Sequence, residues 1–295
     1  MKIALLALLC CLLWGSATPS IKIGYELFQI GSADTMSQIL FAGVRFTLAG
    51  ILTIIICSII SRKPLVPKKG SWKMVLKLSL VQTVIQYFFF YMGLAHTVGA
   101  KGAIISGMNC FFALLISALV FRMEKLSAKK LLGCIIGFTG IMVLNITSSF
   151  TLSFTLAGEG ALVLSTLVYA LSSVLIKRYS SEENPVTLSG WQFVLGGVVM
   201  IIVALCGGGR LEPISAKAWL LMLYMGALSA VAYTIWGLLL KNNPVSKVTA
   251  FSFSTPVFGV ILSIIFLKES INLLQYIFAL ILVCVGISIV NAKNS

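Results

Sequence analysis

Long apolar runs constrain this chain more than any other feature of its sequence. A helix needs about 20 apolar residues to cross the hydrocarbon core of a bilayer, and such runs follow one another through the 295 residues. Only 10% of the residues are charged, against about 25% in a soluble domain, and the mean hydropathy is +1.05. The sequence therefore predicts an integral membrane protein with no room for a soluble catalytic domain.

The apolar windows predict ten transmembrane helices. We place them near residues 3–23, 37–60, 73–94, 102–121, 131–147, 158–176, 187–207, 217–240, 248–267 and 272–291. Pro, Gly and Asn mark the joints between them, as in the Asn242-Asn243-Pro244 segment. The first run has the Lys2 and the small residues of a signal peptide, but it continues to Ile23 and is long enough to span, so we interpret it as a first transmembrane helix.

The basic residues predict the orientation of the chain. The net charge is +14, from 22 lysines and arginines against 8 acidic residues, and the basic residues lie between apolar runs. With both termini in the cytoplasm, the inner connections hold Lys2, Arg62, Lys63, Lys68, Lys69, Lys73, Lys77, Arg122, Lys125, Lys129, Lys130, Lys177, Arg178, Lys241, Lys247 and Lys293. The outer side holds only Lys22, Lys101, Arg210, Lys217 and Lys268. This bias predicts cytoplasmic termini, a plasma membrane location and contact with anionic lipid headgroups on the cytoplasmic side, with no nucleic acid partner.

The two halves of the chain repeat each other. Residues 42–50 align with 189–197 at an offset of about 147 residues, and residues 100–145 align with 246–291 at nearly the same offset. We therefore divide the chain into repeats 1–147 and 148–295. Because each repeat holds an odd number of spans, the second must cross the membrane upside down. The predicted fold is all-α, with ten transmembrane helices in two inverted five-helix repeats around a central cavity, an architecture typical of transporters.

Polar and aromatic side chains inside the spans are the candidates for a substrate site, since polar groups are costly at membrane depth. The predicted cavity residues are Trp14, Ser16, Gln82, Gln86, Tyr87, Asn109, Tyr169, Ser173, Tyr233, Trp236, Ser252 and Thr255. Serine and threonine have an alternative role in close helix packing, which we favour for Ser165. Aromatic residues have an alternative role in filling the core. For the amide side chains we favour a place in the cavity wall, because amides are costlier to bury than hydroxyls.

Two prolines and two charges within the spans have separate predicted roles. Pro19 and Pro256 each lack the backbone N–H that a helix interior needs, and we expect hinges there. Arg45 and Glu159 both lie toward the outer side. Three hypotheses stand for them: an ion pair, a coupling proton on Glu159, or side chains that extend to the outer headgroups.

Catalysis and metal binding are not predicted. The chain has one histidine and lacks the H-E-x-x-H, G-x-S-x-G and Gly-rich phosphate motifs. All seven cysteines lie in apolar runs without C-x-x-C spacing, so we interpret them as small buried hydrophobic residues. We expect no enzyme activity, no metal and no cofactor. A membrane subunit that transports nothing is the alternative from another functional class.

Several motifs, in this order, resemble the EamA branch of the drug/metabolite transporter superfamily. They are Trp14-Gly15-Ser16, Arg45-Phe46, Glu124-Lys125-Leu126, Gly158-Glu159-Gly160, and Pro256 with Glu269. The resemblance covers essentially the whole chain and implies that spans one to four and six to nine surround a central cavity, with spans five and ten outside. It also implies transport of small metabolites, commonly export of amino acids. We expect a small-molecule substrate and a monomer or homodimer. Export of drugs or organic cations is the alternative within the superfamily. The second half has Gln192 where the first has Arg45, so a role of that arginine is not duplicated.

Overall fold

The protein is a multi-pass helical bundle. The computed structural model describes residues 2–97, 99–145, 154–267 and 272–292, and every regular element within these ranges is helical. Nine helical segments of this described part are long and apolar enough to cross a membrane. The fifth predicted span corresponds to α7 (Ala128–Asn145), which is not one of the nine and has two lysines in its first turn. Lys268, Glu269 and Lys293 lie outside the described residues.

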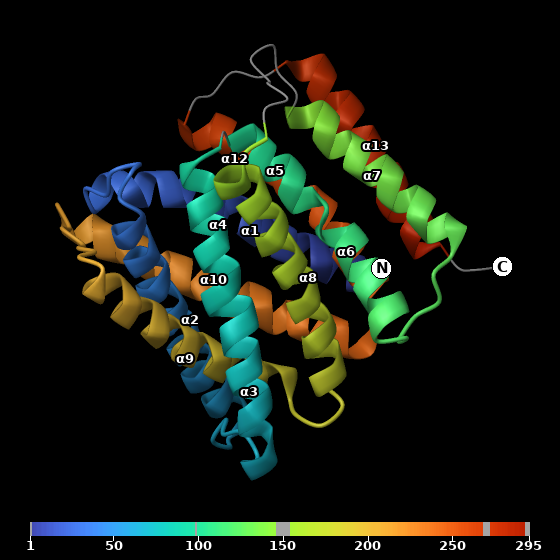
Figure 1. The fold of residues 1–295 in the computed structure, drawn as a ribbon. Helices are drawn as coiled ribbons and strands as arrows, with labels where there is room; N and C mark the ends of the chain where they lie inside the picture. Colours follow the sequence, from blue (N-terminus) through green and yellow to red (C-terminus); the bar gives the residue numbers. More distant parts are fainter. Residues whose placement is uncertain (1, 98, 146–153, 268–271, 293–295) are drawn as a thin grey trace.

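Several spans are built from more than one helical element (Figure 1). The first half contains α1 (Lys2–Leu27), α2 (Thr35–Ser61), η1 (Lys69–Ser71), α3 (Trp72–Leu78), η2 (Ser79–Ile85), α4 (Gln86–Ala95), α5 (Gly99–Gly107), α6 (Asn109–Leu115), η3 (Ile116–Val120) and α7. The second contains η4 (Leu156–Gly160), α8 (Ala161–Tyr179), α9 (Pro185–Cys206), α10 (Ala216–Asn242), α11 (Val245–Thr249), η5 (Ala250–Phe253), α12 (Ser254–Leu267) and α13 (Leu273–Asn291). The elements η2, η3 and η4 are π-helical, whereas η1 and η5 are 3-10 turns.

Polar caps and breakers set the helix ends. The Asp34 carboxylate accepts from the backbone N–H of Ser37 at the start of α2, and Asn184 caps α9 with Pro185 in its first turn. These are the residue types that satisfy the free N–H groups of a helix start. The α2 helix ends at Ser61, and the next residue, Arg62, has a left-handed φ of 52°.

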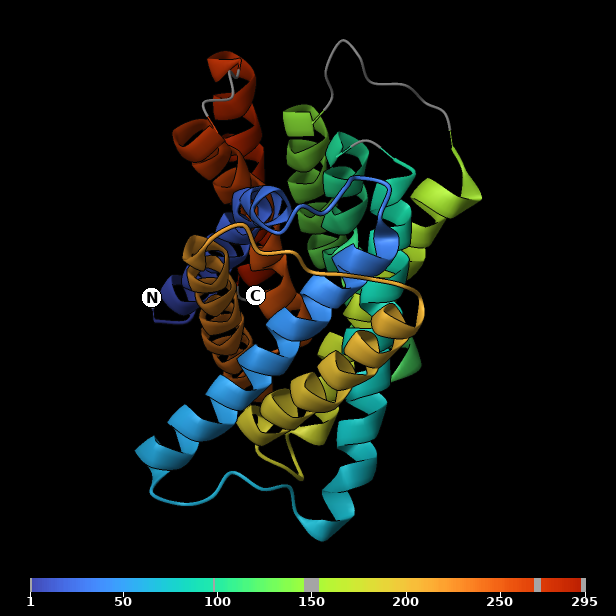
Figure 2. The same cartoon turned by 90° about the vertical axis from the view of Figure 1, so that its left-hand side faces the viewer.

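Glycines bring α2 and α9 into close contact on one flank, which faces the viewer in Figure 2. A Cβ added at Gly43 would lie 3.0 Å from the Gly197 carbonyl oxygen, and one at Gly50 would lie 2.6 Å from that of Gly190. The two backbones therefore touch without side chains between them, as small residues allow in membrane helices.

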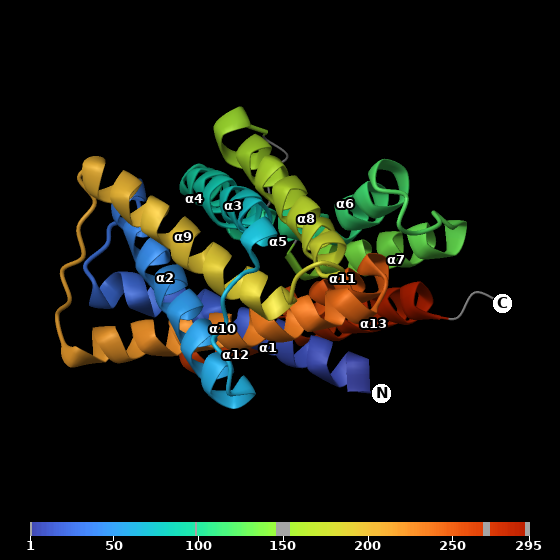
Figure 3. The same ribbon diagram turned by 90° about the horizontal axis from the view of Figure 1, so that it is seen from below.

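The helices α7 and α13 form a similar pair on the opposite flank, and Figure 3 shows the two pairs at opposite ends of the molecule. A Cβ added at Gly133 would lie 2.9 Å from the Gly286 carbonyl oxygen, and one at Gly140 would lie 2.9 Å from that of Ala279. Between the pairs, α1 packs against α10 and α12, while α8 packs against α4 and α6. This central group surrounds the site described below.

Apolar side chains face outward as well as inward. Ile59, Ile60 and Leu274 are more than 70% exposed, at 71%, 76% and 78%. Such surfaces are stable only against lipid. Among the cysteines, Cys206 and Cys284 are exposed on α9 and α13 and Cys57 on α2 is half-buried. The prediction that all seven are buried is therefore wrong for these three, because lipid also accepts a small apolar side chain.

Candidate functional site

A cavity of about 230 Å³ lies among the central helices. Its walls come from α1, α2, α4, α5, α6, α8, α10, η5 and α12, and therefore from both halves of the chain. The lining residues are Trp14, Ala17, Ile21, Arg45, Gln86, Tyr87, Phe90, Ser106, Gly107, Asn109, Ser165, Thr166, Tyr169, Tyr233, Ser252, Thr255 and Pro256. Pockets for drug-sized ligands occupy roughly 300–1,000 Å³, so this volume suits a smaller metabolite.

Breaks in helix geometry place two amides in the cavity wall. Asn109 begins α6 directly after Met108, which separates this helix from α5, and Gln86 begins α4 directly after the π-helical η2. Asn109 is 2% exposed and neither of its amide atoms bonds to a described residue, and the Oε1 atom of Gln86 is also without a partner in this part of the chain. Buried amides without partners cost free energy, so a bound solute would find hydrogen-bonding groups here.

Aromatic rings form another wall. The ring of Trp14 packs edge-on against Tyr233 at 5.1 Å and against Trp236 at 4.9 Å between centroids. The hydroxyls of Tyr87 and Tyr233 are 3.0 Å apart and share a hydrogen bond, which links α4 to α10. Edge-to-face packing of this kind fixes the rings relative to one another. The wall is therefore rigid, apolar on its faces and polar at its hydroxyl edges.

Arg45 places a positive charge in the cavity wall. It is 4% exposed, and its Nε donates to the Ser229 hydroxyl at 3.1 Å. Ser229 in turn donates to the Met225 carbonyl at 2.9 Å, which fixes the serine. The guanidinium carbon also lies 5.2 Å from the centre of the Phe46 ring.

Most of the predicted cavity residues line the cavity, but some lie outside it. Those in the wall are Trp14, Gln86, Tyr87, Asn109, Tyr169, Tyr233, Ser252 and Thr255. Ser16 instead donates to the Leu13 carbonyl, Ser173 donates to that of Tyr169, and Trp236 lies behind Trp14. Gln82, in the π-helical η2, is 1% exposed and does not line the cavity.

The structure gives Arg45 and Glu159 different partners. The Glu159 carboxylate accepts from the Thr97 hydroxyl at 2.7 Å and from the Thr155 backbone N–H at 2.8 Å, and it closes the first turn of η4. An ion pair between Arg45 and Glu159, one of the three hypotheses for these charges, is not among the contacts that the structure describes.

The two prolines lie in different settings. Pro19 lies inside α1, whereas Pro256 lines the cavity in the first turn of α12, where no helical N–H bond is needed. The break in the ninth span is the 3-10 turn η5 that precedes Pro256.

Sequence reasoning missed several lining residues: Ala17, Ile21, Phe90, Ser106, Gly107, Ser165 and Thr166. Helical spacing could have found some of them, because Ala17 and Ile21 follow Trp14 on one helix face, and Ser165 precedes Tyr169 by one turn. Ser165, which we assigned to packing, lines the cavity and donates to the Gln86 carbonyl at 2.8 Å.

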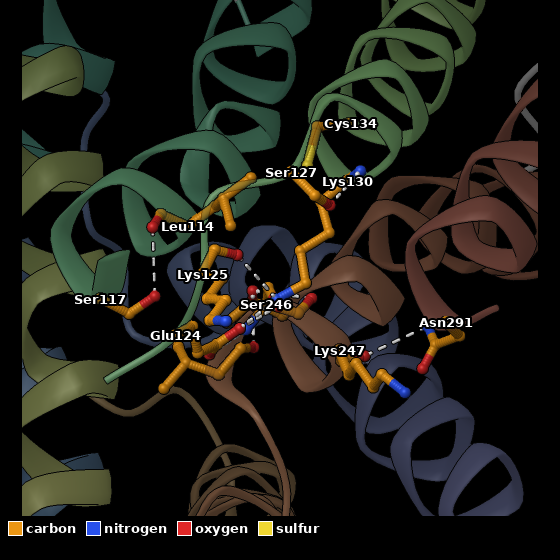
Figure 4. Close-up of polar contacts among 12 residues, drawn as sticks. Leu114, Ser117, Glu124, Lys125, Ser127, Lys130, Cys134, Ser246, Lys247 and Asn291 are labelled. Carbon is orange, nitrogen blue, oxygen red and sulfur yellow. Dashed lines mark hydrogen bonds and ion pairs between the residues drawn. The ribbon is translucent and has the colours of Figure 1, made fainter. Parts of the chain in front are cut away.

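A second polar cluster joins the two halves at the predicted cytoplasmic end (Figure 4). Glu124 follows η3, and its carboxylate accepts from the backbone N–H of Ser246 at 3.0 Å, from the Ser246 hydroxyl and from the Lys130 ammonium at 2.7 Å. Burial alone would raise the pKa of Glu124, but the hydrogen bonds from Lys130 and Ser246 outweigh it and hold that pKa below its ordinary value. The ionised carboxylate therefore fastens the start of α11 to the start of α7.

The family follows from comparison with known proteins. The model of the EamA-like transporter family matches residues 1–146 and 156–292. The chain belongs to the EamA-like transporter family. The resemblance seen in the sequence is thereby confirmed, and the family together with the relatives named as transporters points to a membrane transport role.

Relatives of this EamA-like transporter are distant but cover most of it. A WAT1-related chloroplastic protein of Arabidopsis thaliana is 24% identical over 94% of this chain, which spans 66% of that protein. An uncharacterized transporter of Synechocystis sp. is 24% identical over 90% of this chain and 82% of its own length. The uncharacterized transporter YvbV of Bacillus subtilis is 24% identical over 99% of this chain and 92% of its own length. A crystal structure at 17% identity superposes with a TM-score of 0.80 over 98% of both chains, which shows a shared fold.

Proposed function

We propose that this EamA-like transporter moves small metabolites across the membrane by alternating access, as a secondary-active or facilitative carrier that exports amino acids or related compounds. The observation that carries the proposal is the cavity between the two halves, with buried amides on one wall and aromatic rings on another. A solute with polar and apolar parts matches such a lining.

Reciprocal helix contacts support two inverted repeats, 1–147 and 148–295. Gly43 aligns in sequence with Gly190, and Gly50 with Gly197, yet in space Gly43 approaches Gly197 and Gly50 approaches Gly190. A two-fold relation between two similar units produces crossed contacts of this kind. The α7–α13 pair repeats the pattern, and the family model matches the chain in two segments of similar length. We therefore keep α7 as a tenth transmembrane helix.

Hydrogen bonds between loops and helix ends support the proposed orientation, in which the protein lies in the plasma membrane with both termini in the cytoplasm. Lys68 donates through its backbone N–H to Glu183 at 2.9 Å, and the Lys177 ammonium donates to the Lys241 carbonyl at 2.7 Å. These bonds join connections that carry most of the basic residues, as expected for one cytoplasmic face. Labelling of a single cysteine introduced at Lys125 tests the orientation, since only a reagent that enters the cytoplasm should reach it.

Transport of organic cations or drugs is a second candidate function. The rings of Trp14, Tyr87 and Tyr233 favour it, because aromatic faces attract cations. The positive charge of Arg45 in the same wall opposes it. A membrane subunit without transport activity would bind none of the compounds below.

Purified protein tests the proposal in two steps. A thermal-shift screen of amino acids, nucleobases, sugars and organic cations identifies a ligand, and flux of that ligand into proteoliposomes is then measured. We expect saturable flux that Gln86→Ala lowers at least about tenfold, by the loss of a hydrogen bond to the solute. Thr139→Ala, on the exposed face of α7, is the matched control and should leave flux unchanged. Leakage that does not saturate and that Gln86→Ala leaves unchanged would contradict the proposal.

A further inference from the structure

The unusual feature of the cavity is a buried cation without a carboxylate partner. Arg45 is 4% exposed and lines the cavity, and its hydrogen bond among the described residues goes to the neutral hydroxyl of Ser229 at 3.1 Å. No salt bridge of Arg45 is among the contacts that the structure describes, whereas Lys130 pairs with Glu124. A charge taken out of water requires a counter-charge or several hydrogen bonds, and the protein supplies Arg45 with little of either.

We propose that Arg45 binds the carboxylate of the transported solute. This inference rests on the proposed function and names the solute class: small organic acids, including zwitterionic amino acids. A guanidinium has five N–H donors in a planar fork that matches a carboxylate, and it stays protonated at every physiological pH. The bond from Nε to Ser229 occupies one donor and fixes the orientation of the group. The remaining donors are on the two terminal nitrogens, which can hold both oxygens of one carboxylate.

The rest of the lining fits the remainder of such a solute. Trp14, Tyr87 and Tyr233 provide ring faces for an apolar or aromatic body. Asn109 and the Oε1 atom of Gln86 provide buried polar atoms without partners in the described part of the chain, which can bind an ammonium or a hydroxyl group. A molecule with a positive charge and no anionic group would instead lie beside the Arg45 charge in a region of low dielectric, which is unfavourable.

The repeat equivalent of Arg45 shows that the charge is specific to one half. Gln192 occupies the aligned position on α9, is fully buried, and accepts a hydrogen bond from the Thr83 hydroxyl at 2.7 Å. It does not line the cavity. Arg45 is therefore the one charged residue in the cavity lining that the structure describes.

Binding to the purified protein tests the inference with three probes of similar size and different charge: 3-phenylpropionate, 3-phenylpropylamine and 3-phenylpropanol. Phenylalanine is the zwitterionic probe. We expect the two carboxylates to bind, with the amine at least about tenfold weaker. Arg45→Gln should weaken carboxylate binding by about tenfold or more and leave binding of the alcohol unchanged, whereas Arg45→Lys should restore part of the loss. Arg210→Gln, at an exposed arginine, is the matched control.

Other outcomes separate this inference from the proposed function. If Arg45→Gln does not fold, Ser229→Ala replaces it, and we expect a smaller loss of carboxylate binding, because the guanidinium remains but is less well oriented. The inference is overturned if the unmodified protein binds the amine as tightly as the acids, if it binds neither acid, or if the variants bind both acids normally. Transport of the amine or alcohol alone would overturn it while the carrier function stands. Binding of the acids through Arg45 without flux would support it and contradict the carrier function.

Discussion

Two buried charges of the first half, Glu124 and Arg45, have different surroundings. Glu124 has the ammonium of Lys130 and both donors of Ser246 around it, whereas Arg45 has a serine hydroxyl and an aromatic ring. Removing one member of a buried ion pair costs more than the pair itself contributes, because the other charge is left without a partner. We therefore expect Glu124 to act on stability and Arg45 on solute binding.

Glu124→Gln should lower the free energy of unfolding by about 3 kcal/mol, because the side chain of Lys130, which is 10% exposed, would lose its counter-charge. Thermal unfolding in detergent measures the change. The double variant Glu124→Gln/Lys130→Met should recover much of the loss, and Glu182→Gln, at an exposed glutamate, should have no effect. A Glu124→Gln protein as stable as the original would show that the cluster contributes nothing.

The same residue predicts a pH dependence. The pKa of Glu124 is lower in the folded protein than its ordinary value, so the unfolded chain takes up the proton first as the pH falls. The stabilisation is therefore complete above the ordinary glutamate pKa of about 4.3 and is lost as the pH falls through the lowered value. The difference in Tm between the protein and Glu124→Gln should be constant near neutral pH and shrink in acid. A difference that stayed the same in acid would mean that the carboxyl group is not ionised.

At the scale of helices, the α2–α9 contact depends on the absence of side chains. Gly50→Ala would place a Cβ 2.6 Å from the Gly190 carbonyl oxygen and 2.7 Å from the backbone nitrogen of Val194, and backbone atoms cannot rotate away. We expect a loss of about 1–3 kcal/mol in stability from this overpacking. Gly70→Ala is the matched control, since a Cβ there meets nothing within 4 Å. Equal Tm values for both variants would contradict the close packing of α2 on α9.

The helices could largely be predicted from the sequence, because a bilayer allows few alternatives to apolar helices of about 20 residues. The interruptions within these helices could not be predicted from the sequence. Gln82 and Gln86 are four residues apart, which predicts one shared face, yet Gln86 lines the cavity and Gln82 does not. The Glu124–Ser246 contact also has no local signal, since it joins residues distant in sequence. The sequence supplied the polar and aromatic candidates, and the packing of the helices against one another decides which of them line the cavity.

For the whole molecule, alternating access requires that the cavity open to one side at a time. Trp236, Cys10 and Cys11 are almost fully buried beside the cavity on its predicted cytoplasmic side, and the Glu124 cluster joins the halves beyond them. We propose that opening toward the cytoplasm separates these groups, with bends near Pro19 and at the η5–Pro256 segment.

Counterflow in proteoliposomes tests this account most directly. Vesicles loaded with an excess of unlabelled solute are diluted into labelled solute, with 3-phenylpropionate or phenylalanine as the probe. An alternating-access carrier should accumulate label transiently above its equilibrium level, because each return of the cavity exchanges one solute for another. Pro256→Ala should slow this exchange more than it changes the half-saturating concentration. Label that enters only to equilibrium at a rate independent of internal solute would contradict alternating access by this protein.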